Sequence, residues 1–246
     1  MPYEDVKDYA DLYDIVSQEN NDGNDIDFYV ERAKETDGKV LEVACGTGRI
    51  YLQMLEEGVE AYGIDLSEEM LEKLREKAEK RSLNPDVSQE DMRDFNLDEK
   101  FSLIIIPYRS FLHNLTIEDQ LSTLDSIYRH LEDDGKLILN FYSPDIDFIA
   151  ENYGKEKTRE IQDGEYTLVE NVEMIDSVNW IIEFEKKLVK DGEEKWSSKA
   201  NTKMITRTEF ELLLENSSFS DWEVYGGFDL EELEDSKQEM IWIVEK

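Results

Sequence analysis

The sequence predicts an α/β protein built on a doubly wound, mostly parallel sheet of about seven strands, with an antiparallel β insertion after the fifth strand. Between residues 39 and 142, strand-length apolar runs alternate with segments of helical spacing. This alternation produces parallel strands joined by right-handed crossovers. After Pro144 the pattern changes to long strand-like runs separated by turn residues, and the first pattern returns at Thr206.

Short helices are expected to open the chain. Residues 6–16 and 25–34 carry apolar residues at helical spacing, and the Asn-rich segment 20–24, which contains Gly23, is expected to form a turn between them. An apolar strand over residues 39–44 then breaks at a pair of glycines, and a helix follows over residues 49–57.

The alternation continues with a second strand over residues 60–65 and a helix that runs to about Arg81. Ser67 is expected to cap this helix. Glu68 and Glu69 occupy its first turn, where the helix dipole favours carboxylates.

Three strands and one helix complete the parallel part of the predicted sheet. The strands are expected over residues 86–89, 101–107 and 136–142. Thr116 and Asp119 resemble a capping box that opens a helix to Leu131, and residues 133–135 form a turn before the last strand.

The insertion is predicted as an antiparallel sheet. Its strands are expected over residues 166–175, 180–190 and 195–205. Asp176-Ser177 and Asp191-Gly192 supply turns between them. Thr206 then caps a helix to Asn216, and two final strands follow over residues 222–226 and 239–244.

These elements predict three parts. They are an N-terminal helical cap (1–37), a main domain (38–145 with 206–246) and a lid (146–205).

Acidic residues dominate the composition. The chain has 61 Asp and Glu against 27 Lys and Arg, a formal net charge of −34. This charge repels phosphate backbones, so no nucleic-acid partner is expected. The acidic residues are spread along the whole chain, which favours a solvation device for a salt-loving or salt-tolerant organism. An acidic face that attracts a cationic substrate is the alternative.

Few residues are suited to disulfides or metals. Cys45 is the single cysteine, and the only histidines are His113 and His130. An intramolecular disulfide is excluded, and no metal site is expected. The sequence shows neither a signal peptide nor an apolar run long enough to span a bilayer, so a cytoplasmic protein without membrane contact is expected.

Gly46-Thr47-Gly48 separates the first strand from the following helix, and Asp65 ends the next strand. Glycines there bring the backbone close to a ligand, and a carboxylate at Asp65 can accept both ribose hydroxyls. Both features fit any ligand with an adenosine half, including NAD. A dinucleotide site would have a small residue at Tyr51, and Glu42 would repel a pyrophosphate. These residues disfavour NAD and favour a positively charged ligand.

Several ordered motifs extend this pattern over about residues 38–145. They are VLEVACGTGR (40–49), AYGIDLSEEML (61–71), QEDMRDF (89–95) and LEDDGKLILN (131–140). Together they resemble the motifs of class I S-adenosylmethionine (SAM)-dependent methyltransferases. The resemblance implies the class I methyltransferase fold, SAM as cofactor and S-adenosylhomocysteine as product.

Carried over residue by residue, the resemblance implies a set of cofactor contacts. The expected cofactor-binding residues are Tyr13, Glu42, Ala44, Gly46, Thr47, Gly48, Arg49, Asp65, Leu66, Met70, Asp91, Met92 and Pro107. Asp65 would hold the ribose, and Asp91 the adenine amino group. Core filling by Met70 and Met92, and a solvated role for Asp91, are the alternatives. Cys45 is interpreted as a small buried residue rather than a nucleophile.

The acceptor is expected beyond the carboxyl end of the fourth strand, at residues 107–113. Tyr108, Arg109 and His113 are the predicted catalytic residues. Arg109 could pair with an acidic group of the substrate or simply with a surface acid, and His113 could act as a general base or only form a loop hydrogen bond. The Pro-Tyr pair resembles part of the Asp/Asn-Pro-Pro-Tyr signature of base-modifying amino-methyltransferases, but the Asp or Asn is absent.

Other aromatic and basic residues are candidates for the same region. Tyr9 and Tyr13 could close over SAM, and Trp180, Trp196 and Arg207 could line the lid.

The sequence therefore predicts a methyltransferase that acts on a small-molecule substrate, with N-methylation favoured over O-methylation. The expected state is a monomer or homodimer. Methylation of a protein or tRNA, and a non-catalytic SAM-binding regulator, are the alternatives, and a NAD-dependent oxidoreductase ranks behind them.

Overall fold

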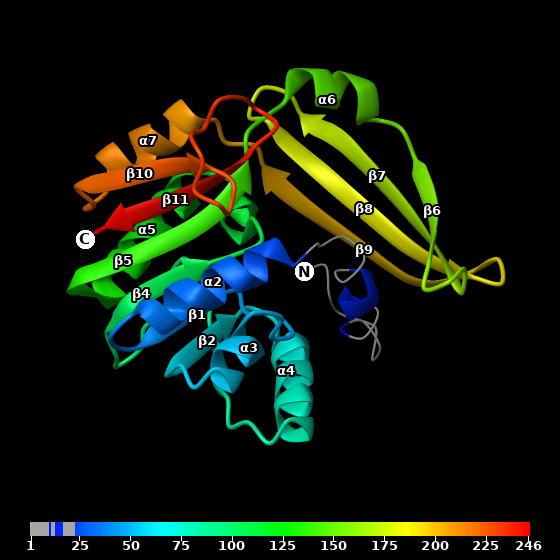
Figure 1. Cartoon of the computed structure of the whole chain (residues 1–246). Helices are drawn as coiled ribbons and strands as arrows, with labels where there is room; N and C mark the ends of the chain where they lie inside the picture. The colour runs from blue at the N-terminus through cyan, green and yellow to red at the C-terminus, as the bar shows by residue number, and fades with distance from the viewer. Residues whose placement is uncertain (1–9, 11–12, 17–22) are drawn as a thin grey trace. The chain divides into compact units, whose positions relative to one another are not determined.

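The computed structural model describes residue 10, residues 13–16 and residues 23–246 (Figure 1). Two compact units divide these residues. The larger unit, here called the sheet unit, consists of residues 23–143 and 206–246, and the smaller unit contains residues 10, 13–16 and 144–205.

A seven-stranded sheet forms the centre of the sheet unit, with the strand order β10-β11-β5-β4-β1-β2-β3. The strands are β1 (Val40–Val43), β2 (Ala61–Asp65), β3 (Asp86–Gln89), β4 (Phe101–Ile106), β5 (Leu131–Tyr142), β10 (Asp221–Gly226) and β11 (Glu239–Glu245). The first five pair in parallel, and β11 runs antiparallel to both β5 and β10. The prediction of a mostly parallel, doubly wound sheet is confirmed.

Helices cover both faces of this sheet. They are α2 (Asn24–Glu35), α3 (Tyr51–Glu56), α4 (Glu68–Lys80), the short 3-10 helix η1 (Ser110–His113), α5 (Ile117–His130) and α7 (Arg207–Glu215). Figure 1 shows α2, α3 and α4 on one side of the sheet and α5 and α7 on the other. The predicted caps are confirmed: Ser67, Thr116 and Thr206 each accept a backbone N–H from the first turn.

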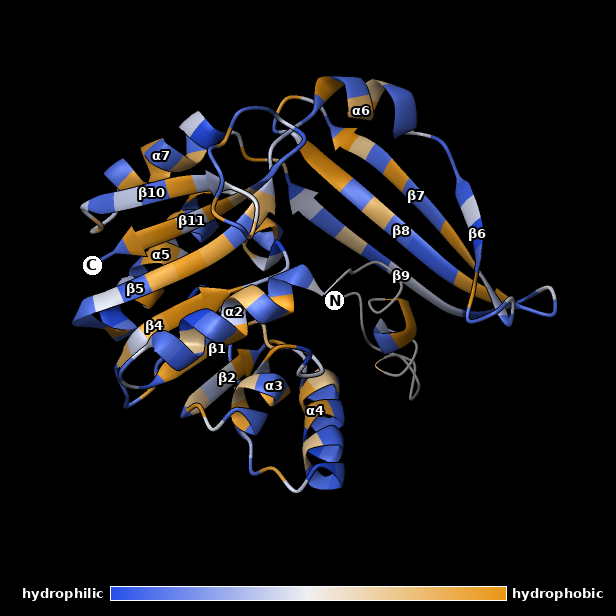
Figure 2. Ribbon diagram, viewed as in Figure 1, coloured by the Kyte–Doolittle hydropathy of each residue, from blue (hydrophilic) through white to orange (hydrophobic). Residues whose placement is uncertain are grey.

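The core lies along the central strands. All four residues of β1 are buried, and Ile104, Ile105 and Ile106 of β4 are completely buried. Figure 2 shows β4 and much of β5 in the hydrophobic colour, as expected for parallel strands covered by helices on both faces. Because the strands are parallel, their carboxyl ends meet at one edge, and the loops that follow them lie together.

One local prediction is wrong. Residues 133–135 were expected to form a turn before the fifth strand, but they lie inside β5. The pairing with β4 passes from Phe101↔Leu131 to Leu103↔Lys136, so the intervening residues of β5 form an irregularity in the ladder. Turn-forming residues are compatible with such a bulge because it leaves them outside the regular pairing.

The smaller unit contains a four-stranded antiparallel sheet in the order β6-β7-β8-β9. Its elements are α6 (Ile146–Asn152), β6 (Lys157–Ile161), β7 (Tyr166–Asp176), β8 (Ile181–Lys190) and β9 (Glu193–Lys203). The three long strands were predicted, whereas α6 and β6 were not. Asp191 and Gly192 both have positive φ, which suits the tight turn between β8 and β9. The role of this sheet as a lid stays a prediction.

In the part of the chain that the structure describes, no helix combines the length and apolar character needed to cross a membrane.

Candidate active site

The glycine turn follows β1 at the carboxyl edge of the sheet. Ala44, Gly46 and Gly48 all have positive φ, at 60°, 55° and 85°. A Cβ atom on Gly48 would lie 2.9 Å from side-chain atoms of both Leu52 and Leu74, so this position also needs glycine for space. The turn therefore runs close to the helices behind it while its outer side remains open at Gly46, where a Cβ would meet nothing within 4 Å.

Asp65, the last residue of β2, is joined to this turn. Its Oδ2 accepts the backbone N–H of Gly46 at 2.8 Å, and its Oδ1 accepts the N–H of Ser67 at 2.9 Å. Burial raises the pKa of the carboxyl group, and the two N–H donors oppose that shift. Each oxygen retains acceptor capacity for a further hydroxyl group.

Glu42 lies within β1, just before the glycine turn. Its side chain is buried, and Oε2 has no hydrogen-bond partner. Burial raises the pKa of this carboxyl well above its usual range, while the charge of Arg49 opposes the shift. A buried carboxylate without a partner is costly, so this position favours a ligand that brings a cation or a donor.

Arg49 forms hydrogen bonds with Asp25, a residue that was not predicted to belong to the site. Its guanidinium donates to both oxygens of Asp25 on α2, at 2.9 and 2.5 Å. Asp25 is 4% exposed, so the pair is largely withdrawn from water. The same guanidinium lies over the ring of Tyr108, with its central carbon 4.9 Å from the ring centroid. Arg49 thus joins α2, the glycine turn and the loop after β4.

Tyr51 occupies the position where a dinucleotide site would have a small residue. The side chain is completely buried, its hydroxyl donates to the carbonyl of Ala61 at 3.0 Å, and it accepts the N–H of Asp86 at 2.8 Å. The tyrosine therefore ties α3 to the starts of β2 and β3, away from the glycine turn.

The residues predicted on the adenine side come from two loops. Leu66 is 57% exposed directly after β2, and Met70 is buried on α4. Asp91 forms an ion pair with Arg93 at 2.5 Å, and this partner lowers the pKa of the Asp91 carboxyl. Met92 accepts from the Asn114 amide at 3.4 Å. Their contacts with adenine stay predictions.

The loop after β4 is strained. Tyr108 and Arg109, both non-glycine residues, have positive φ of 55° and 66°. The Tyr108 N–H donates to Oδ1 of Asn140 at 3.0 Å. Pro107 is buried at the end of β4, whereas His113 is exposed at the end of η1.

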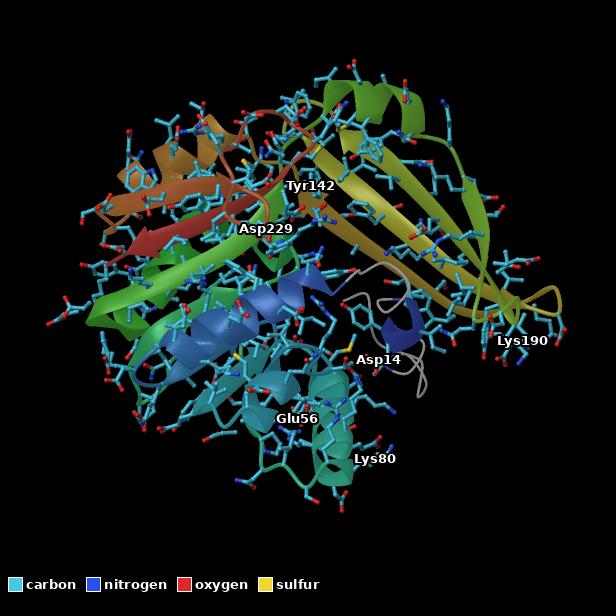
Figure 3. The ribbon with its side chains drawn as sticks, in the orientation of Figure 1. Asp14, Glu56, Lys80, Tyr142, Lys190 and Asp229 are labelled. Carbon is cyan, nitrogen blue, oxygen red and sulfur yellow. The ribbon has the colours of Figure 1, made fainter. Side chains whose placement is uncertain are left out.

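Arg109 is paired with Glu239, the first residue of β11. Its Nε and Nη2 donate to the two carboxylate oxygens at 2.9 and 2.8 Å, and the guanidinium lies over the ring of Tyr142. The sequence left two interpretations of Arg109 open: pairing with an acidic group of the substrate, or with an acid of the protein. The structure shows the pairing with an acid of the protein, Glu239. Tyr142 ends β5, and Asp229 lies in the loop that leads into β11 (Figure 3).

Most of the predicted site residues belong to the sheet unit. Glu42, Ala44, Gly46, Thr47, Gly48, Arg49, Asp65, Leu66, Met70, Asp91, Met92, Pro107, Tyr108, Arg109 and His113 all belong to it. Tyr13, Trp180 and Trp196 belong to the smaller unit. Tyr9 lies outside the described residues. Arg207 pairs with Glu211 on its own helix.

Three polar residues of the edge were not predicted from the sequence: Asp25, Asn140 and Glu239. Cys45 is buried against Gly63, in keeping with a small buried side chain. Among the residues described by the structure, no three His, Cys, Asp or Glu side chains are arranged to hold a metal ion.

Comparison with known proteins places this geometry in a family. Residues 40–135 match the family model described as a methyltransferase domain. The Bacillus subtilis protein YqeM is 35% identical over 117 residues, which cover 47% of each chain. The dTDP-3-amino-3,4,6-trideoxy-alpha-D-glucopyranose N,N-dimethyltransferase of Streptomyces venezuelae is 31% identical over 54% of this chain and 56% of its own. These matches span about half the length of the relatives.

The fold is also similar over nearly the whole chain to a solved structure. The S-adenosylmethionine-dependent methyltransferase from Clostridium acetobutylicum superposes with a TM-score of 0.81 at 20% identity, covering 96% of both chains. The fold, the glycine turn and the matched family model agree with one another. Residues 40–135 therefore form a methyltransferase domain, and the chain has the fold of class I SAM-dependent methyltransferases.

Proposed function

We propose that the protein is an N-methyltransferase that acts on the amino group of a small molecule. The choice of SAM as cofactor is carried by the two acidic side chains around the glycine turn, Glu42 and Asp65, and the choice of an amine acceptor is supported by the relatives. NAD would bring a pyrophosphate toward these acidic side chains, whereas SAM brings a positive charge and no phosphate.

The residues present fit SAM. Asp65 has acceptor capacity for ribose hydroxyls, and the buried Oε2 of Glu42 lacks a partner that an ammonium group would supply. Leu66 offers an exposed apolar surface to a flat base. When bound, SAM supplies a methyl group carried on a sulfonium. The protein's task is then to hold a neutral amine in line with that methyl group in a dry pocket.

N-methylation and a small-molecule acceptor are supported by the Streptomyces venezuelae relative, whose name describes dimethylation of a sugar amine. Tyr108 and His113 are proposed to lie on the acceptor side because they follow β4 at the same edge as the glycine turn. The unperturbed imidazole group titrates near neutrality, so an exposed histidine side chain such as His113 is suited to take the proton released by the methylated amine.

A direct assay tests the proposal. The purified protein is incubated with SAM and one candidate acceptor at a time: glycine, putrescine or a dTDP-linked 3-amino sugar. S-adenosylhomocysteine and the methylated product are both measured by mass spectrometry. SAM-dependent methylation of an amine is expected, and Asp65→Ala should reduce it. Binding of SAM without methylation of any amine would instead indicate an acceptor of another class or a SAM-binding regulator.

A further inference from the structure

Tyr108 is fixed from two sides by residues far apart in the sequence. On one side its ring lies beneath the Arg49 guanidinium, which Asp25 holds through two hydrogen bonds. On the other side its backbone N–H donates to Asn140, whose Oδ1 also accepts the hydroxyl of Tyr29 at 2.7 Å. We call these four residues, Asp25, Tyr29, Arg49 and Asn140, the Tyr108 clamp.

Both sides of the clamp begin on the same helix. Asp25 and Tyr29 are four residues apart on α2, so they lie on one helical face, one turn apart. Asp25 is 4% exposed, and Tyr29 and Asn140 are 0% and 3% exposed. The contacts therefore form a closed circuit from α2 through Arg49 to Tyr108, and back through Asn140 to α2. Arg49 and Tyr108 are half-buried, and the other members of the circuit are buried. A closed circuit of contacts limits the freedom of each member more than separate contacts do.

The clamp holds Tyr108 within a backbone segment whose conformation is unfavourable for residues other than glycine. Tyr108 and Arg109 are successive residues with positive φ, a conformation that costs free energy for residues with a Cβ. Such a conformation persists only where surrounding contacts determine it. Asn140 supplies a hydrogen bond to the first strained residue, and its Nδ2 donates to Glu239 at 2.7 Å, which in turn holds Arg109. One side chain of β5 thus supports both strained residues.

We propose that Arg49 and Asn140 are positioning residues that fix Tyr108 between the cofactor turn and the acceptor. This inference rests on the proposed function, in which Tyr108 lies on the acceptor side. It assigns Arg49 a role toward Tyr108 in addition to the cofactor contact that the sequence predicts. Because reactivity depends steeply on alignment, a small displacement of Tyr108 should lower kcat more than it alters SAM binding.

The test places a reporter on Tyr108 itself. In the full-length protein, 3-fluorotyrosine is incorporated at position 108, and its ¹⁹F resonance is recorded together with thermal melting and calorimetric titration with SAM. Asn140→Asp places a carboxylate against Glu239 and should move or broaden the resonance. Arg49→Lys keeps the charge but removes the planar stack, and should also move it.

Arg81→Lys is the matched control, since Arg81 pairs with exposed Glu56 in the same unit (Glu56 is labelled in Figure 3). The proposal is overturned if the resonance is the same in Asn140→Asp and Arg49→Lys as in the parent, or if Arg81→Lys moves it equally. With the best amine of the assay above, kcat should fall at least about tenfold in Asn140→Asp, with a smaller change in the Kd for SAM. If no amine is methylated, the proposed function fails while the ¹⁹F signal still decides the clamp.

Discussion

Gly46 donates its backbone N–H to Oδ2 of Asp65 at 2.8 Å, so the turn after β1 and the end of β2 are joined by a hydrogen bond. Asp65 also accepts the N–H of Ser67, the N-cap of α4. One carboxylate thus fixes the glycine turn and the start of α4, the two segments that the proposed cofactor would contact. Loss of this side chain should affect cofactor binding both directly and through the shape of the turn.

Asp65→Ala is therefore expected to weaken SAM binding by about 1–3 kcal/mol, or about five- to 150-fold in Kd. Asp65→Asn should also weaken it, because an amide group would face a backbone N–H with a donor of its own. Calorimetric titration with SAM measures both effects. Asp86→Ala is the control, because Asp86 is exposed and lies at the start of β3, at the opposite edge from the carboxyl ends of the parallel strands. Unchanged affinity in Asp65→Ala would remove Asp65 from the cofactor site.

Two glycines with positive φ, Gly48 in the turn after β1 and Gly58 just after α3, should differ in their effect on stability. Gly48→Ala adds a Cβ 2.9 Å from atoms of Leu52 and Leu74, in addition to the strain of its positive φ. Gly58→Ala carries a similar φ with nothing within 4 Å, so it reports the strain alone. Gly58→Ala is expected to cost about 1–2 kcal/mol, and Gly48→Ala about 1–3 kcal/mol more. Urea denaturation of the three proteins gives the difference, and equal losses would show that the helices yield to the added methyl group.

Local signals in the sequence located the regular elements well. Ser67, Thr116 and Thr206 were predicted as caps because a cap depends on residues only three positions apart. The helix α6 was missed because it has only seven residues, which are too few to establish a helical period in the sequence. The extent of β5 was missed because residues 133–135 carry turn chemistry, and only the pairing with β4 shows that they lie within a strand.

The site could be predicted only where its residues share a motif. The glycine turn and Asp65 follow successive strands and were identified in this way. The clamp was not, because the hydrogen bonds from Tyr29 to Asn140 and from Asn140 to Glu239 span 111 and 99 residues. Asn140 lies within an ordinary apolar strand, and no local pattern marks it. Only the sheet order, which places β5 between β4 and β11, brings these side chains together.

Added salt should stabilise the protein. The formal net charge of −34 produces self-repulsion in the folded state, and salt reduces it because the screening length falls from about 10 Å at 0.1 M to about 3 Å at 1 M. The Tm is therefore expected to rise steadily with KCl into the molar range. A Tm that does not rise would contradict the interpretation of the charge as an adaptation to salt. A rise complete at millimolar KCl would instead indicate a specific cation site.

Glu42 should make stability depend on pH in a defined direction. Its folded-state pKa is raised well above the ordinary value by burial. The native protein therefore retains a proton on Glu42 at pH values where the unfolded chain has lost it. The stability that this group contributes is complete below the unfolded pKa of about 4.3 and is lost as pH rises toward the folded pKa.

Glu42→Gln removes this titration while it preserves the shape of the side chain. The Tm of Glu42→Gln relative to the parent should thus increase between pH 5 and pH 8, as measured by thermal melting in one buffer series. Glu72→Gln, an exposed position on α4, controls for the change in net charge. A constant difference across this range would show that Glu42 is ionised in the native state. Because an ammonium ligand favours the ionised form, SAM should bind more tightly as pH rises through this range, and Glu42→Gln should weaken SAM binding most at pH 8.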